Sequence, residues 1–397
     1  MVNIFIFSPV SLEYGRGGEI YSMDLAAGLQ KYYNITLFHT NLYYADKFLS
    51  KGETIKKLKE RGFKFKKIER MNFATSNVLN REFSFPYPLD IIRLHKRIKK
   101  NDVVYLSVSN VKNNLMFILL YLLNPRVKFI LGYHRPLYSD KFLSLYNLKY
   151  RLSILLLSLF KKRFYHQTIS QHAKIFLENF YVSNKVFHIV EGLEIENFFN
   201  EDFEKKRNPN LIIMYAGALN DEHKGIGVLL KAIEGFIKKY KELKVKFEIY
   251  GFGPLEKETK DLIRRFPQHI KLFGYIEYKD LVEAFKNCDV FISSSRREPF
   301  GRVIIEALAG KSIIISTKTF GALDILKGKD FAFFLEELSE NEIIKKILKV
   351  YRLWMEKPGK FKSLQNSASN YVFQTYTISK EIEMFKDFIN KLIRNQI

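Results

Sequence analysis

The sequence predicts an α/β protein with two series of parallel strands. Short apolar runs alternate with longer amphipathic stretches along most of the 397 residues, which is the pattern of βαβ units. A polar, proline-containing segment at 201–210 separates the two series. In the second series, an apolar strand runs into a small polar loop and then a helix, with one glutamate in the loop and another in the helix. These three observations set the fold class and the location of the candidate site.

The first series contains five expected strands, and the first helix follows the first of them. That helix is expected at 20–32, where Leu25, Ala26 and Leu29 recur at helical spacing. The apolar start of the chain is short and lacks a basic region and a cleavage site, so it predicts a strand rather than a signal peptide. The five strands are expected at 4–8, 35–39, 103–106, 127–132 and 165–169.

The second series repeats the alternation and ends in a helix. The last amphipathic stretch, 379–394, has no strand after it. The strands are expected at 211–215, 245–250, 270–273, 290–293 and 313–316. We therefore expect a first domain at 1–190, a linker at 191–210, a second domain at 211–375 and a terminal helix within 376–397.

The chain is strongly basic, with a net charge of +23 and a pI near 9.6. Such a charge favours anionic partners, including phosphorylated substrates and acidic membrane surfaces. The basic residues are spread along the sequence, and no helix-turn-helix, zinc-finger or RNA-binding signature accompanies them. We therefore expect no nucleic-acid partner and read the excess as surface charge, with a side suited to an anionic membrane.

One stretch bears on membrane contact. Residues 148–164 mix a run of Leu, Ile and Ser with basic residues at both ends, which is compatible with a helix at a membrane surface. A buried helix of the first domain explains the same pattern and is the favoured reading. No stretch has 18 uninterrupted apolar residues, so no transmembrane helix is predicted. The single cysteine, Cys288, excludes an internal disulfide framework; we expect a cytoplasmic protein with peripheral membrane contact.

The loop and helix after residue 293 carry the strongest functional pattern. Glu298 lies in the loop and Glu306 about two turns into the helix. Open α/β sheets bind ligands at the carboxyl ends of their strands, where both carboxylates would lie. Between them, the start of the helix near Gly301 offers backbone N–H groups and a positive dipole end to a phosphate. A phosphate seat flanked by carboxylates suits a nucleotide-diphospho-sugar, although each glutamate alone could be an ordinary solvated side chain.

This arrangement resembles the E-x7-E signature of the retaining GT-B glycosyltransferases of family 4, the glycosyl transferases group 1 type. The resemblance covers nearly the whole chain, is strongest at 211–325 and is loose at 40–100. It implies a GT-B fold, with two facing Rossmann-like domains, a cleft between them and a carboxy-terminal helix, within 376–397, that packs back on the first domain. It also implies transfer of a sugar from a nucleotide diphosphate to a hydroxyl acceptor with retention of anomeric configuration, in glycan or glycolipid assembly.

The resemblance also assigns residues of the second domain. Glu298 would bind sugar hydroxyls and Glu306 the ribose hydroxyls. Lys224 matches the diphosphate-binding lysine, whose charge would offset negative charge on the leaving nucleotide. The donor-binding set in this domain is completed by Gly217, Phe300, Gly301 and Arg302.

In the first domain, the resemblance implicates a Gly-rich turn and one histidine. Gly17 and Gly18 follow the first strand and would open onto the donor phosphates and the acceptor. His134 follows another strand and matches a histidine near the sugar, so we count it with Glu298 and Lys224 as catalytic. The chain departs from the family in two places: Ala218 stands where many members have arginine, and Glu191 replaces an asparagine. Arg16 and Arg135 are candidates to supply the charge that Ala218 lacks, and we expect no catalytic role for Glu191.

No metal or cofactor is predicted, because the chain has no D-x-D triplet and no His/Cys cluster with metal-ligand spacing. The nucleotide sugar would be a co-substrate, and the acceptor a glycan, a lipid-linked group or another hydroxyl compound. Two other functions stay open. One is a different GT-B enzyme, such as a sugar-nucleotide epimerase or a phosphorylase. The other is a binding module that holds the donor without turnover.

Overall fold

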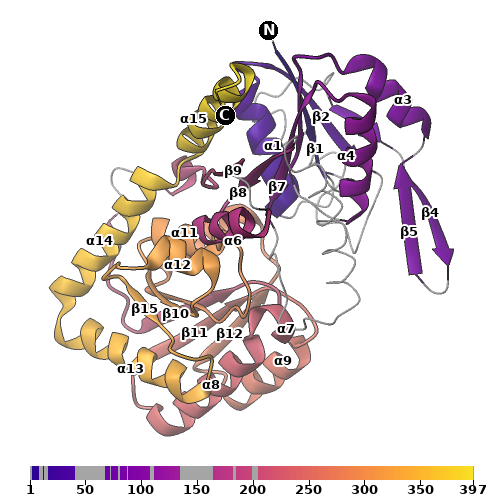
Figure 1. The fold of residues 1–397 in the computed structure, drawn as a ribbon. Coiled ribbons are helices and arrows are strands. Elements are labelled where there is room, and N and C mark those ends of the chain that lie inside the picture. Colours follow the sequence, from indigo (N-terminus) through magenta and orange to yellow (C-terminus); the bar gives the residue numbers. More distant parts are fainter. Residues whose placement is uncertain are drawn as a thin grey trace. The chain divides into compact units, whose positions relative to one another are not determined.

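The computed structural model describes residues 2–8, 12, 17–40, 68–71, 73–78, 81–86, 88–107, 111–134, 164–181, 185–198 and 204–396. The chain forms two compact units (Figure 1). The first contains Met1–Val190 together with Ile378–Ile397, and the second contains Glu191–Thr377.

The first unit is built on a seven-stranded parallel sheet in the order β3-β2-β1-β6-β7-β8-β9. A separate antiparallel hairpin, β4 (Phe73–Val78) and β5 (Arg81–Pro86), precedes the helix that leads into β6. The strands of the sheet are β1 (Asn3–Phe7), β2 (Asn34–Thr40), β3 (Ile68–Met71), β6 (Val103–Leu106), β7 (Lys128–Tyr133), β8 (Phe164–Thr168) and β9 (Val186–His188).

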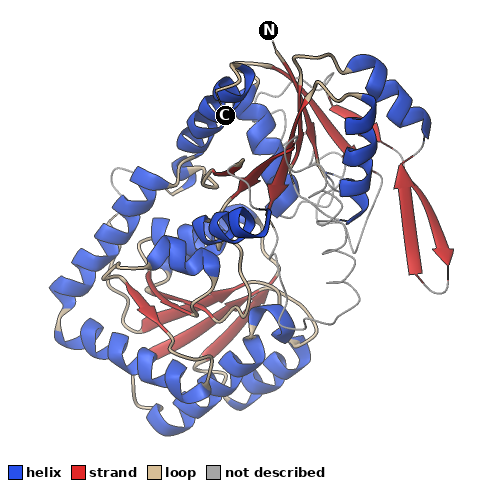
Figure 2. Ribbon diagram, in the orientation of Figure 1, coloured by secondary structure: helices blue, strands red, loops and turns tan. Residues whose placement is uncertain are grey.

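Helices cover both faces of this sheet (Figure 2). Because alternate residues of a strand point to opposite faces, Phe5 and Phe7 of β1 join one apolar cluster while Ile4 and Ile6 join the other. The first cluster is closed by α3 (Pro88–Arg97), α4 (Val111–Leu123) and α6 (Gln171–Tyr181). The second is closed by α1 (Gly17–Leu29) and α15 (Ile378–Ile393). The last helix therefore completes the core of the first unit.

The second unit has a six-stranded parallel sheet in the order β12-β11-β10-β13-β14-β15. The strands are β10 (Leu211–Ala216), β11 (Val245–Tyr250), β12 (Ile270–Gly274), β13 (Val290–Ser293), β14 (Ile313–Ser316) and β15 (Ala332–Phe334). The chain first adds strands on one side of β10 and then returns to add β13 on its other side. The carboxyl ends of β10 and β13 thus form the switch point at which open α/β sheets bind ligands.

Eight helices and one 3₁₀ turn are described in the second unit. They are η3 (Ile195–Asn197), α7 (Asp221–Lys224), α8 (Ile226–Tyr240), α9 (Glu256–Arg265), α10 (Tyr278–Asn287), α11 (Arg302–Ala309), α12 (Phe320–Leu326), α13 (Glu340–Glu356) and α14 (Pro358–Thr375). α13 packs beside α8, and α14 beside α11. The polar segment before β10 is anchored to this unit, because the buried Lys205 ammonium donates to the backbone carbonyls of Gly310 and Lys311, each at 3.1 Å.

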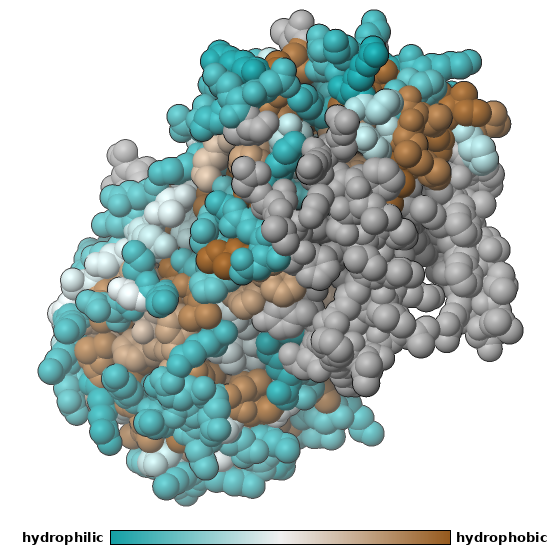
Figure 3. Space-filling model, in the orientation of Figure 1, coloured by the Kyte–Doolittle hydropathy of each residue, from teal (hydrophilic) through white to brown (hydrophobic). Residues whose placement is uncertain are grey.

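Hydrophilic residues dominate the visible surface of the described parts of the chain (Figure 3). None of the helices described in the structure combines the length and apolar character needed to cross a bilayer. The basic and apolar stretch at 148–164, which the sequence places either at a membrane surface or in the core, lies almost entirely outside the described residues.

Candidate functional site

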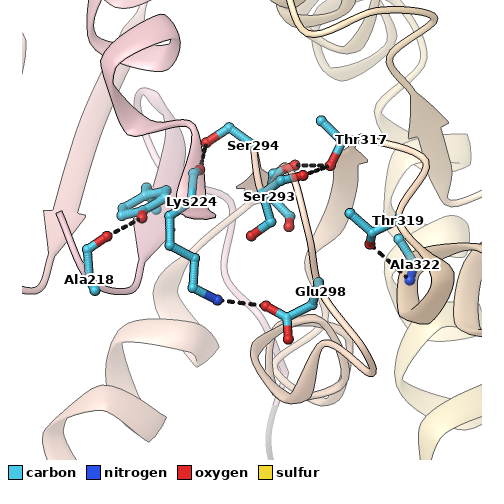
Figure 4. A network of polar contacts seen from close by, with 10 residues as sticks. Ala218, Lys224, Ser293, Ser294, Glu298, Thr317, Thr319 and Ala322 are labelled. Atoms are coloured by element: carbon cyan, nitrogen blue, oxygen red, sulfur yellow. Dashed lines mark hydrogen bonds and ion pairs between the residues drawn. The ribbon is translucent and has the colours of Figure 1, made fainter. Parts of the chain in front are cut away.

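Lys224 and Glu298 meet at the switch point of the second sheet. Lys224 follows β10, Glu298 follows β13, and the ammonium Nζ lies 2.6 Å from Oε2 of the carboxylate. Figure 4 shows the lysine side chain extending from α7 to the loop that carries Glu298. Both side chains are only partly buried, with 28% and 15% exposed. The two residues predicted to bind the diphosphate and the sugar are thus neighbours that a ligand can still reach.

The short helix α7 fixes the position of Lys224. It begins after Asn220, whose side chain accepts a hydrogen bond from the His223 N–H, and ends at Gly225 with φ of 60°. A side chain at Gly225 would be strained in this conformation and would collide with the carbonyl of Ser294. The Ser294 hydroxyl also donates to the Lys224 carbonyl at 2.8 Å (Figure 4). Lys224 is therefore held against the loop after β13 by backbone contacts.

Helix α11 starts directly after the loop glutamate. Gly301 precedes it with φ of 98°, a left-handed conformation that favours glycine. The loop is braced on both sides: the Glu298 carbonyl accepts from the Gly321 N–H at 3.1 Å, and the buried Phe300 ring packs edge-on against Tyr376 at 5.9 Å. The first turn of α11 has N–H groups without partners inside the helix, and such groups close to the Lys224–Glu298 pair are suited to an anion.

Arg302 lies between two buried carboxylates. Its Nε is 3.3 Å from Oε1 of Glu306, and its NH1 is 3.1 Å from Oε1 of Glu191. The side chains of Glu306 and Glu191 are only 5% and 9% exposed. Burial raises the pKa of Glu306, against the opposing effect of Arg302. Glu306 is therefore a desolvated carboxylate held by one cation, which makes it a strong acceptor for hydroxyl groups.

Two tyrosines, neither of them among the residues predicted from the sequence, complete this region. The Tyr215 hydroxyl donates to the Ala218 carbonyl at 2.8 Å, and burial together with the nearby Glu298 charge raises its pKa. Burial and the charge of Glu306 likewise raise the pKa of Tyr278. Both phenols stay protonated at neutral pH. Nearby, the Gly217 N–H donates to the Tyr250 carbonyl at 3.0 Å, which joins the ends of β10 and β11.

His134 lies in the first unit, just past the end of β7. Its Nε2 is 3.1 Å from Oε1 of Gln167, and its ring stacks obliquely on Tyr21 of α1 with centroids 4.1 Å apart. Burial lowers the pKa of His134 to about 4 despite the hydrogen bond to Gln167. The imidazole is therefore neutral at physiological pH and can act as a hydrogen-bonding group rather than as a cation.

The first helix begins earlier than the sequence predicts. Gly17 and Gly18 occupy the first turn of α1 rather than the loop before it. Tyr21, one turn further on, touches His134, so this helix start and the histidine belong to one region of the first unit. Arg16 and Arg135, the expected substitutes for the missing arginine at 218, lie outside the described residues.

The described residues contain no group of three or more potential metal ligands from His, Cys, Asp and Glu. The site in the second unit instead combines an ammonium group, a helix start and two carboxylates. The sequence could point to Glu298 and Glu306 through the E-x7-E spacing and to Lys224 through the family resemblance. It gave no signal for Tyr215 or Tyr278, and it marked Glu191 only as a departure from the family, because their contacts depend on the folded chain.

Residues 197–367 match the model of the family described as Glycosyl transferases group 1. The chain carries a domain of that family. Within this glycosyl transferases group 1 domain lie Gly217, Lys224, Glu298, Phe300, Gly301, Arg302 and Glu306. Gly17, Gly18 and His134 lie before it, in the first unit, and Glu191 lies six residues before the match begins.

Curated relatives match about half of the chain. CapM of Staphylococcus aureus, a capsular polysaccharide biosynthesis glycosyltransferase, is 27% identical over 190 residues, which cover 45% of this chain and 49% of CapM. The GPI3 subunit of phosphatidylinositol N-acetylglucosaminyltransferase from Saccharomyces cerevisiae is 20% identical over 183 residues, 46% of this chain and 40% of that protein. The chain thus matches less than half the length of these relatives.

Solved structures match over the whole chain. HepE of Anabaena in complex with UDP has a TM-score of 0.72 at 16% identity, covering 98% of this chain and 100% of HepE. Sucrose-phosphate synthase from Thermosynechococcus elongatus has a TM-score of 0.73 at 13% identity, covering 100% of both chains. These likenesses confirm the predicted GT-B fold class, and the glycosyl transferases group 1 domain forms its second α/β unit.

Proposed function

We propose that this protein is a retaining glycosyltransferase that moves a sugar from a nucleotide-diphospho-sugar to a hydroxyl acceptor. The single observation that carries the proposal is the Lys224–Glu298 pair beside the start of α11. A cation, a helix amino terminus and a carboxylate placed together suit a diphosphate joined to a sugar. The family match of the second unit supports the same chemistry.

In this proposal each group has a distinct role. Lys224 and the first N–H groups of α11 would bind the diphosphate and stabilise the charge that grows on it as the sugar leaves. Glu298, released from its ion pair, would accept hydrogen bonds from the sugar. Glu306 would accept from the ribose hydroxyls. The acceptor would bind the first unit near Gly17, Gly18 and the neutral His134.

A uridine nucleotide is the first donor to test, because solved structures similar to this chain contain UDP, including HepE of Anabaena and the pneumococcal O-GlcNAc transferase GtfA. The acceptor is proposed to be membrane-linked or otherwise anionic. The +23 charge supports this, as do the names of relatives that act in capsule and phosphatidylinositol glycan synthesis.

The proposal is tested by a thermal-shift panel of UDP-, GDP- and ADP-sugars, followed by product analysis. A donor at 100 times its dissociation constant should stabilise the protein by about 2.7 kcal/mol. Binding followed by transfer to an added acceptor supports the proposal. An epimerised donor or phosphate-dependent cleavage would identify a different GT-B enzyme, and binding without turnover would identify a binding module.

A further inference from the structure

Glu191 differs from its neighbours in the site, because it lies outside both the E-x7-E motif and the matched family domain. It directly follows Val190, where the chain passes from the first unit into the second. Its segment is held by the second unit: the Leu193 N–H donates to the Tyr376 carbonyl at 2.9 Å, and Leu193 forms a parallel bridge with Thr377. The carboxylate of Glu191 is therefore presented to α11 from a fixed backbone.

The guanidinium of Arg302 contacts both this carboxylate and that of Glu306. NH1 contacts Glu191 at 3.1 Å, while Nε contacts Oε1 of Glu306 at 3.3 Å. An arginine with a single carboxylate partner favours a bidentate fork that occupies both oxygens. With Glu191 absent, Arg302 would be free to form that fork with Glu306 and cover the oxygens that hydroxyl donors need.

The charges favour the same conclusion. Two buried carboxylates contact the guanidinium of Arg302, so its positive charge is already paired. A paired guanidinium attracts a phosphate only weakly, and the buried carboxylate oxygens favour neutral hydrogen-bond donors. The vicinal hydroxyl groups of a ribose are donors of that kind.

We propose that Glu191 is a positioning residue of the nucleotide site. By holding one end of Arg302, it lets Arg302 orient the Glu306 carboxylate without closing over it, so that Glu306 can receive the ribose hydroxyls. This inference rests on the proposed function, and it gives a positioning role to Glu191, for which the sequence predicts no catalytic role. It predicts an energetic coupling between Glu191 and the ribose that is transmitted through Arg302.

The test is a calorimetric cycle with UDP and 2′-deoxy-UDP on the wild-type chain, Glu191→Gln and a control, Glu258→Gln. Glu258 is an exposed glutamate in the first turn of α9. We expect Glu191→Gln to weaken UDP binding about tenfold, the size of one hydrogen bond to a charged group, and to change 2′-deoxy-UDP affinity little. Glu258→Gln should leave both affinities unchanged.

A merely structural role for Glu191 gives a different pattern. Equal losses for UDP and 2′-deoxy-UDP, or no loss for either, would overturn the inference. If Glu191→Gln does not fold, Glu191→Asp keeps the charge. The inference then predicts that it retains part of the wild-type preference for UDP, and loss of binding to both probes alike would contradict it. If the wild-type chain binds none of UDP, GDP and ADP, the proposed function fails and the inference falls with it.

Discussion

The buried environment of the Glu306 carboxylate suits it to accept hydrogen bonds from ribose hydroxyls. Glu306 is buried in α11, touches Arg302 and lies close enough to Tyr278 to raise the pKa of that phenol. A water-exposed glutamate would bind ribose weakly, because water competes for its oxygens. Desolvation removes that competition, so the carboxylate should discriminate strongly between nucleotides with and without free ribose hydroxyls.

Replacing this carboxylate tests its role. Glu306→Gln keeps the shape of the side chain and removes the charge, so nucleotide binding should weaken by about 1.5–3 kcal/mol. Calorimetry with UDP measures the change, and circular dichroism checks that the fold is intact. Glu258→Gln on the exposed face of α9 is the control and should bind as the wild-type chain does. Unchanged affinity in Glu306→Gln would remove this residue from the site.

Two histidines of the first unit predict how stability depends on pH. Burial lowers the pKa of His134 to about 4 and that of His166 to about 3. In the unfolded chain both titrate near 6.5, so the unfolded state takes up protons first as the pH falls. The two histidines contribute fully to the free energy of unfolding above about pH 6.5. This contribution is lost as the pH falls toward their pKa values in the folded protein, and the loss amounts to roughly 3 kcal/mol or more in total.

Thermal unfolding between pH 7 and 5 measures this dependence. We expect the melting temperature to fall with pH and the slope to be shallower in His166→Gln, which cannot be protonated. His223→Gln, at an exposed position of α7, should leave the slope as it is. A wild-type stability that is independent of pH in this range would contradict the burial of these two rings.

The sequence could also predict which residues belong to the site, but not how they pair. Lys224 and Glu298 are 74 residues apart and Glu191 and Arg302 are 111 apart. Glu298 is identified by the E-x7-E spacing, and Lys224 by its match to the diphosphate-binding lysine of the family. The contact of Arg302 with Glu191 depends on where the chain enters the second unit, which no local pattern encodes.

At the scale of elements, the strands that carry long apolar runs were predictable. β6, β11, β13 and β14 have the bounds that the sequence predicts, because three of them are buried throughout, β11 alternates buried and half-buried residues, and a polar residue or glycine follows each. The short edge strands β3, β9 and β15 were not predicted, since three or four residues give little periodicity. The hairpin of β4 and β5 was missed as well, at a part of the chain where the resemblance is loose.

The backbone conformation at the start of α11 depends on Gly301, and replacing this glycine tests whether the helix start binds the nucleotide. Gly301→Ala forces a left-handed φ of 98° on a residue with a Cβ atom, which would also lie 2.9 Å from Cδ1 of Ile304. We expect a loss of about 1–2 kcal/mol in stability and weaker nucleotide binding, because the N–H groups of the first turn shift.

A matched glycine in a different helix separates these effects. Gly359 lies in the first turn of α14 with open space around its Cα, so Gly359→Ala should be neutral or stabilising by about 0.5–1 kcal/mol. Urea unfolding and calorimetry on both variants give the comparison. If Gly301→Ala matches the wild-type chain in stability and in nucleotide affinity, the backbone geometry of this loop does not determine nucleotide binding.

At the scale of the whole molecule, the charge predicts an interaction with anionic lipid. Each basic residue near an anionic leaflet contributes about 1 kcal/mol within a Debye length. We expect co-sedimentation with liposomes that contain anionic lipid, decreasing steeply from low to high salt, and no sedimentation with neutral liposomes. A protein that stays in the supernatant with anionic liposomes at low salt would favour an acceptor in solution.

The α/β architecture of both units followed from the alternation of apolar and amphipathic segments, whereas the placement of α15 on the first domain was expected only from the family resemblance. α15 follows the second unit in sequence but completes the apolar cluster beneath α1, where Ile382 lies against Gly28 and Phe385 against Tyr105. An amphipathic pattern shows that a helix has an apolar face, but it does not show which sheet that face covers.

The most direct test of the central claim is the anomeric configuration of the product. The wild-type protein is incubated with the nucleotide sugar that it binds and an acceptor, in excess EDTA, and the new glycosidic bond is assigned by NMR coupling constants. We predict that transfer persists in EDTA, because Lys224 and the start of α11 supply the positive field at the diphosphate, and that the configuration of the donor is retained, as the resemblance to the retaining family implies. A product with inverted configuration, or activity that chelation abolishes and manganese restores, would contradict the account.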